Sequence, residues 1–209
     1  MSSTEPDPEV NLVWVGVILE GGLIIVALVL ACFGLYDHSQ PLRQIDWPTC
    51  QHSLVWGTVA SLPMLVYLVV FHFWTPSFLQ PMQEFVIENL YPVFRGSTIF
   101  EMLLLSVMAG FCEELLFRWC LQGGISSLLE SRTGQPVSLT IGLLVASILF
   151  GLCHWVNTSY GMTTLFVGVF LGLTMIWSGS FLVPAMAHAI FDFVALIYIS
   201  RLTPEVAAE

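Results

Sequence analysis

Residues 112–118 read Cys-Glu-Glu-Leu-Leu-Phe-Arg and place three ionisable side chains, Glu113, Glu114 and Arg118, inside a long apolar part of the chain. A charged side chain at the centre of a membrane helix costs about 2.5 to 3.5 kcal/mol for the most costly types, so such groups indicate a functional site by default. Glu114 and Arg118 are four residues apart, on one helix face, where they can form an ion pair. The alternative is a purely structural pair, with Glu113 at a water-accessible seam between helices.

The composition is that of an integral membrane protein. The 209 residues are 56% hydrophobic and 10% charged, whereas a soluble domain averages about 25% charged residues. Since about 20 helical residues cross a bilayer, the chain forms one membrane domain in contact with lipid. The net charge is −10, with no lysine and only 5 basic residues. These are too few for the basic patch that nucleic acid requires, so we expect no nucleic-acid partner.

The hydropathy pattern predicts an all-α fold: a polytopic membrane helix bundle with about six transmembrane helices and one interfacial amphipathic helix. The predicted spans are residues 11–36, 53–74, 98–122, 137–156, 161–178 and 181–200. Residues 75–97 carry apolar side chains at helical spacing with Glu84 and Glu88 on the opposite face, as in a helix that lies in the membrane interface. The polar stretches 37–52 and 123–136 are predicted to be loops.

The predicted bundle holds polar side chains that a bilayer excludes, on several separate spans. They are Glu113, Glu114, Arg118, His154, His188 and Asp192. Carboxylates on one span and imidazoles on two others predict a shared, water-filled cavity. A Glu there can take a proton from water, and an imidazole can position that water or donate to an oxyanion. Glu20, in the first span, is expected to face the bundle or a wet crevice rather than to take part in catalysis.

Three short motifs follow one another on successive apolar helices: Glu113-Glu114-x-x-x-Arg118, Phe150-x-x-x-His154 and His188-x-x-x-Asp192. This arrangement resembles the CAAX-protease and bacteriocin-processing family (CPBP, also called Abi), whose eukaryotic branch is the type II CAAX prenyl endopeptidase. The resemblance covers residues 98–200. It implies a metal-independent intramembrane glutamic endopeptidase that needs no cofactor.

The resemblance also implies a role for each motif residue. Glu113 would activate the attacking water, and His154 would help to orient it. His188 and Asp192 would form the oxyanion site, although the eukaryotic branch has Asn at the last position. An ionised Asp cannot donate a hydrogen bond, so Asp192 would be protonated or would act through His188, whose tautomer it can hold.

Glu114 and Arg118 would support this catalytic set. The chain then divides into a disordered acidic tail (residues 1–9), two transmembrane helices with the interfacial segment (10–97) and the catalytic core (98–200). The expected substrate is a membrane-anchored or lipid-modified protein or peptide. The expected location is a multi-pass position in a bacterial or archaeal cytoplasmic membrane.

Straight helices would not bring His154 and His188 to the same depth in the membrane. His154 lies at the end of the fourth predicted span, whereas His188 lies only a short way into the sixth. We therefore expect the fourth or sixth span to be tilted or broken, with irregular backbone at Gly151 and Pro184.

Four other interpretations stay open on the sequence alone. Two Glu and two His side chains could bind a metal ion, although no Glu-x-x-His or His-Glu-x-x-His spacing occurs. Cys112 or Cys153 could act with His154 as a nucleophile. A non-catalytic immunity or scaffold protein could keep the same fold. A proton-coupled transporter would also place carboxylates in the membrane, but the chain shows no internal repeat.

Overall fold

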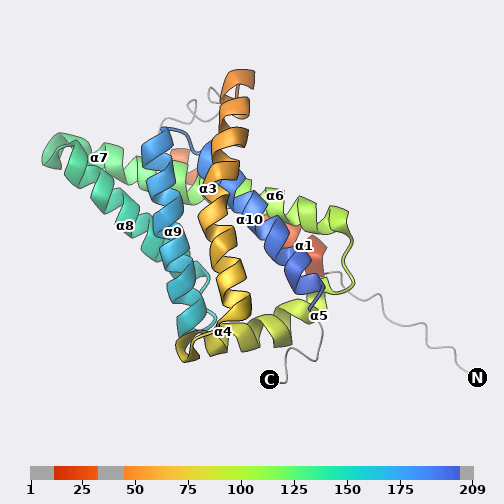
Figure 1. The fold of residues 1–209 in the computed structure, drawn as a ribbon. Helices are drawn as coiled ribbons and strands as arrows, with labels where there is room; N and C mark the ends of the chain where they lie inside the picture. The colour runs from red at the N-terminus through yellow and green to blue at the C-terminus, as the bar shows by residue number, and fades with distance from the viewer. Residues whose placement is uncertain (1–11, 33–44, 203–209) are drawn as a thin grey trace, which may run out of the picture.

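The computed structural model describes residues 12–32 and 45–202, which form helices and no β-strand (Figure 1). The long helices are α1 (Leu12–Cys32), α3 (Trp47–Phe73), α6 (Ile99–Glu114), α8 (Gln135–Cys153), α9 (Thr158–Ser178) and α10 (Leu182–Ser200). The shorter elements are η1 (Ser77–Leu79), α4 (Gln80–Phe85), η2 (Val86–Leu90), α5 (Tyr91–Phe94), η3 (Leu115–Gly123) and α7 (Gly124–Thr133). The predicted all-α class is confirmed.

Helices α1, α3, α8, α9 and α10 are each long and apolar enough to cross a membrane. The remaining predicted span corresponds to α6, which continues directly into η3 and gives one helical run over residues 99–123. The protein is therefore an integral membrane protein built as a polytopic helical bundle.

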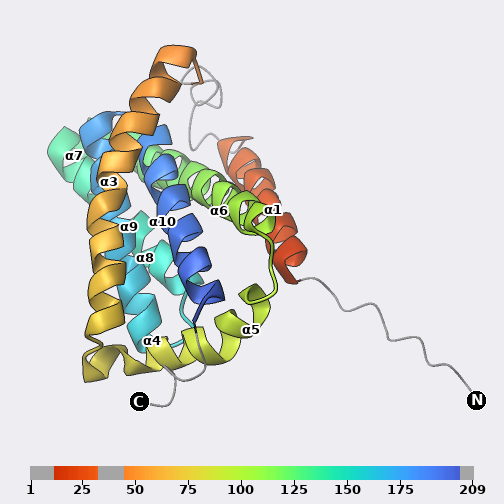
Figure 2. The same cartoon turned by 45° about the vertical axis from the view of Figure 1, so that its right-hand side comes forward.

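The predicted interfacial segment is a helical run of η1, α4, η2 and α5 that lies across one end of the bundle (Figure 2). It buries Val86 and Phe94 and leaves Glu84 and Glu88 exposed. This is the amphipathic pattern expected from the sequence. Asn157 joins the run to the start of α9, because its side-chain Nδ2 donates to the carbonyl oxygen of Pro81 at 3.0 Å.

The predictions of two loops are wrong in part, because the structure shows helix within both stretches. Helix α3 begins at Trp47 because Asp46 caps it, accepting a hydrogen bond from the Thr49 backbone nitrogen at 2.8 Å, as N-cap carboxylates do. Residues 124–133 form α7, whose backbone lies against α8 at Gly142, where a side chain would collide with Ser126. The predicted tail (residues 1–9) and residues 37–44 of the first loop lie outside the described residues.

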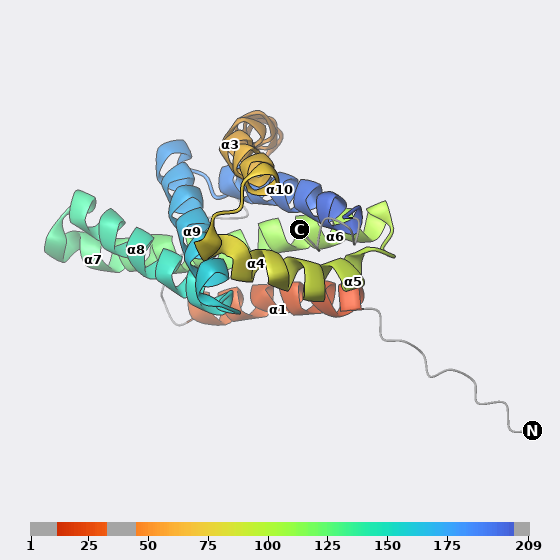
Figure 3. The same ribbon diagram turned by 60° about the horizontal axis from the view of Figure 1, so that its bottom comes forward.

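Helix α10 lies between α3 and α6, and α1 packs on the far side of α6 (Figure 3). Small residues make this close packing possible. A Cβ atom at Gly110 of α6 would lie 2.6 Å from the backbone nitrogen of Ala189 and 2.7 Å from the carbonyl oxygen of Ala185, both on α10. The α6–α10 contact matters for function because it holds Glu113 and Glu114 beside His188.

We expect Gly110→Ala to destabilise the bundle, because the new methyl group would push against the backbone of α10. Overpacking of this kind costs about 1–3 kcal/mol. Thermal unfolding of the purified protein in detergent measures the loss. Gly22→Ala in α1 is the matched control, since nothing lies within 4 Å of a Cβ atom at that position. Equal unfolding temperatures for the two variants would contradict the close approach.

Candidate active site

Glu113 and Glu114 are the last two residues of α6, at the point where the backbone passes into the π-helical turns of η3. Both side chains are buried, with 6% of Glu113 and 0% of Glu114 exposed. Because neighbouring residues on a helix point about 100° apart, the two carboxylates have different surroundings. π-helical turns are rare and occur frequently at functional sites. The sequence did not predict η3.

Glu114 belongs to a buried charged network behind the cavity. Its Oε2 lies 2.8 Å from Nε of Arg118, and both side chains are 0% exposed. The Arg118 guanidinium also lies 4.8 Å from the centroid of the Phe150 ring, a distance at which a cation is attracted to an aromatic face. The Glu114–Arg118 pair expected from the spacing is therefore present.

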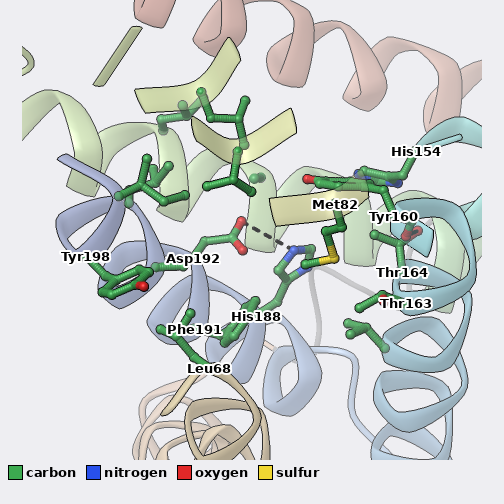
Figure 4. Close-up of a pocket in the computed structure, with 18 of the residues that line it drawn as sticks. Leu68, Met82, His154, Tyr160, Thr163, Thr164, His188, Phe191, Asp192 and Tyr198 are labelled. Carbon is green, nitrogen blue, oxygen red and sulfur yellow. Dashed lines mark hydrogen bonds and ion pairs between the residues drawn. The ribbon is translucent and has the colours of Figure 1, made fainter. Parts of the chain in front are cut away.

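His188, on α10, lies between two carboxylates. Its Nδ1 is 3.0 Å from Oε1 of Glu114, and its Nε2 is 3.4 Å from Oδ2 of Asp192 (Figure 4). Ionised carboxylates only accept hydrogen bonds, so these two partners require an N–H on each ring nitrogen. Asp192 does face His188 as expected, but Glu114 shares the task of orienting the ring, which the sequence did not predict.

His154 occupies the turn that follows α8, with its Nδ1 2.9 Å from the carbonyl oxygen of Phe150. A carbonyl only accepts, so Nδ1 carries the hydrogen and Nε2 of the neutral ring is an acceptor. Nε2 lies 3.8 Å from Oε1 of Glu113. Glu113 and His154, which are expected to bind the attacking water, thus face each other through two hydrogen-bond acceptors.

The histidines do meet the glutamate pair, but the backbone irregularity is not where we expected it. Gly151 and Pro184 lie inside α8 and α10, and α10 runs unbroken to Ser200. Helix α8 instead ends at Cys153, which leaves His154 in a turn. Helix α10 crosses α3 obliquely in Figure 1. A tilted α10 and an early end of α8 bring the side chains together.

These groups line a cavity of about 430 Å³ inside the bundle. Its polar lining includes Glu113, His154, His188 and Asp192, together with Glu20 and the Tyr160 hydroxyl. The rest of the wall is largely apolar and is supplied by α1, α3, the interfacial run, α6, α8, α9 and α10. Met82 of the interfacial run and His188 both line this space (Figure 4).

Glu20 faces the cavity inside the bundle, as expected, but its closeness to Glu113 was not predicted from the sequence. It lies in α1, lines the same cavity as the motif residues, and its carboxyl group lies close enough to that of Glu113 to interact with it. The only signal in the sequence was a carboxylate inside an apolar span. Its position relative to Glu113 depends on how α1 packs against α6, and no local pattern encodes that packing.

The geometry bears on the metal and cysteine alternatives. Within residues 12–32 and 45–202, no group of three or more His, Cys, Asp or Glu side chains is arranged to hold a metal ion. The two ring nitrogens of His154 face the Phe150 carbonyl and Glu113 rather than a thiol. Cys112 is fully buried and Cys153 is exposed.

Comparison with known proteins finds a family match for the region that carries the site. Residues 95–194 match the family model described as type II CAAX prenyl endopeptidase Rce1-like. This part of the chain is similar to the Rce1-like family. The matched residues include all three motifs, so the resemblance expected from them is confirmed. The Rce1-like assignment supports a CAAX-type membrane protease in general terms.

A bacterial protein is similar over more of the chain. The uncharacterized protein YpbD of Bacillus subtilis (strain 168) is 27% identical over 177 residues, which cover 82% of each chain. No solved structure matches this chain.

Proposed function

We propose that this protein is an intramembrane, metal-independent glutamic endopeptidase that hydrolyses a peptide bond in a membrane-anchored or lipid-modified protein or peptide. The observation that carries the proposal is the 3.8 Å approach of Glu113 Oε1 and His154 Nε2 in a cavity inside the bundle. Both atoms are hydrogen-bond acceptors when Glu113 is ionised. A water molecule to one side of the pair can donate one hydrogen to each and turn its lone pair towards a carbonyl carbon.

In the proposed reaction, the water oxygen bonds to the carbonyl carbon while Glu113 takes one of its protons. The tetrahedral intermediate then collapses, the carbon–nitrogen bond breaks, and the proton held by Glu113 passes to the leaving nitrogen. The products are a new carboxyl terminus and a new amino terminus. His154 keeps the water oriented, because its own Nδ1–H is fixed on the Phe150 carbonyl.

His188 is the proposed stabiliser of the oxyanion. Both of its nitrogens face carboxylates in the structure. The contact between Asp192 and Nε2–H must therefore break before this N–H can donate to a substrate oxygen. Asp192 is suited to this because 28% of its side chain is exposed, whereas Glu114 is fully buried with Arg118. Donors fixed in advance at a developing charge make the largest contribution in many hydrolases.

The largely apolar cavity wall supports a hydrophobic or lipid-modified substrate that reaches the site from the bilayer. A bacterial or archaeal cytoplasmic membrane is the proposed location, supported by the similarity to a Bacillus protein. Comparison of new chain termini in the membrane proteomes of cells that express the native protein or Glu113→Gln at matched levels tests the function. Cleavage products that depend on Glu113 are the expected result. Identical proteomes with a phenotype that persists in both cell types would favour an immunity or scaffold role.

We expect metal chelators to leave the activity of the purified protein unchanged. The proposed reaction uses only Glu113 and His154 to handle the water, so it has no step that a bound metal must supply. Activity is measured with and without EDTA and 1,10-phenanthroline on a substrate identified from the proteome comparison. Inactivation that is reversed by added zinc would show that the metal-independent mechanism is wrong.

A further inference from the structure

Glu20 and Glu113 bring two carboxyl groups together from helices that are distant in the chain. Helix α1 packs along α6 (Figure 3), both side chains line the same cavity, and their carboxyl groups lie close enough to interact. Oε2 of each carboxyl group is buried, and no N–H or O–H donor of the described residues reaches either atom. Carboxylates are acceptors only, so this contact is a hydrogen bond only when one of the two groups carries a proton.

Other charged and titratable groups lie around this pair, but the cations among them are already paired with other carboxylates. They come from α6, η3, the end of α8 and the turn after it, α9 and α10, and they are Cys112, Glu114, Arg118, Cys153, His154, Tyr160, His188 and Asp192. The Arg118 charge is paired with Glu114. His188 is held between Glu114 and Asp192. Two adjacent carboxylates without a dedicated counter-charge do not both ionise, as in the carboxyl dyads of other hydrolases.

We propose that Glu20 is a positioning residue that shares one proton with Glu113 and so holds Glu113 ready to act as a base. This inference rests on the proposed function. In the resting pair, the protonated Glu20 carboxyl donates to the ionised Glu113 carboxylate, which stabilises the base and fixes its orientation. Glu20 keeps its proton throughout the reaction. The proton from water goes to Glu113 and from there to the leaving nitrogen, so the pair returns to its starting state.

The test measures kcat, KM and the pH dependence of kcat/KM for the native protein, Glu20→Leu and Glu20→Gln. Leu has a similar size and suits a membrane helix but cannot donate a hydrogen bond. We expect Glu20→Leu to lower kcat about 10- to 100-fold, the value of one hydrogen bond to a charged group, with little change in KM. Its acid limb should move to higher pH by about one unit, because an ionised Glu113 has lost its donor.

Glu20→Gln separates the donor role from simple filling of space. Its amide N–H can donate to Glu113 as a protonated Glu20 does, so this variant should recover most of the activity lost in Glu20→Leu and restore the acid limb. Glu84→Gln is the control for loss of a Glu side chain, because Glu84 is exposed on the interfacial run and does not line the cavity.

Two results would overturn the shared proton. One is a native kcat and pH profile in Glu20→Leu, and the other is an equal loss in Glu20→Gln and Glu20→Leu. Either result leaves the proposed function intact as long as Glu113→Gln is inactive. If Glu113→Gln retains full activity, the proposed function fails first, and Glu20 has no base to position.

Discussion

We expect Glu113→Gln to abolish peptide-bond hydrolysis and to leave the protein folded. Gln keeps the shape of Glu but cannot take a proton from water, and loss of a general base typically costs about 100- to 10,000-fold in rate. Glu113 belongs to neither the Glu114–Arg118 pair nor the His188 contacts, so its neutral substitute leaves the buried network intact. The measurements are kcat on a substrate found in the proteome comparison and the thermal unfolding temperature in detergent.

Glu88→Gln is the matched control for this variant. Glu88 is exposed on the interfacial run and lies outside the cavity, so the same chemical change there should leave kcat as it is. Substantial activity in Glu113→Gln would remove Glu113 as the base. Loss of folding together with activity would instead show that Glu113 has a structural task that its contacts in the structure do not reveal.

The order of the motifs allowed much of the site to be predicted from the sequence. Ionisable residues in an apolar span are costly, so they stand out without any structural knowledge. The four-residue spacing also placed Arg118 beside Glu114 and Asp192 beside His188. Local spacing was sufficient here because each of these contacts lies within one helical run.

Contacts between different helices were harder to predict. The Glu114–His188 hydrogen bond joins residues that are 74 positions apart, and the contact of Glu20 with Glu113 depends on α1 packing against α6. These pairings depend on the close approach of helix backbones at positions such as Gly110. A glycine in the sequence of a membrane helix does not indicate which neighbouring helix it will contact. The π-helical turns of η3 also lack a sequence signal, since their residues read as ordinary helix.

Arg118→Ala should destabilise the fold strongly. Arg118 is fully buried, and its Nε lies 2.8 Å from Glu114. Removal of one partner from a buried ion pair leaves an uncompensated charge and costs about 3–5 kcal/mol. The variant also loses the guanidinium contact with the Phe150 ring. Lower expression and a lower thermal unfolding temperature are therefore expected, and any loss of activity should follow the loss of folded protein.

Arg132→Ala provides the comparison for this variant, because Arg132 is exposed near the end of α7 and does not line the cavity. It should unfold at the native temperature. The informative case is an Arg118→Ala protein that unfolds at the native temperature but has lost its activity. The supporting role of Arg118 would then be wrong, and its charge would have to act on the reaction through Glu114 and His188, which connect it to the cavity.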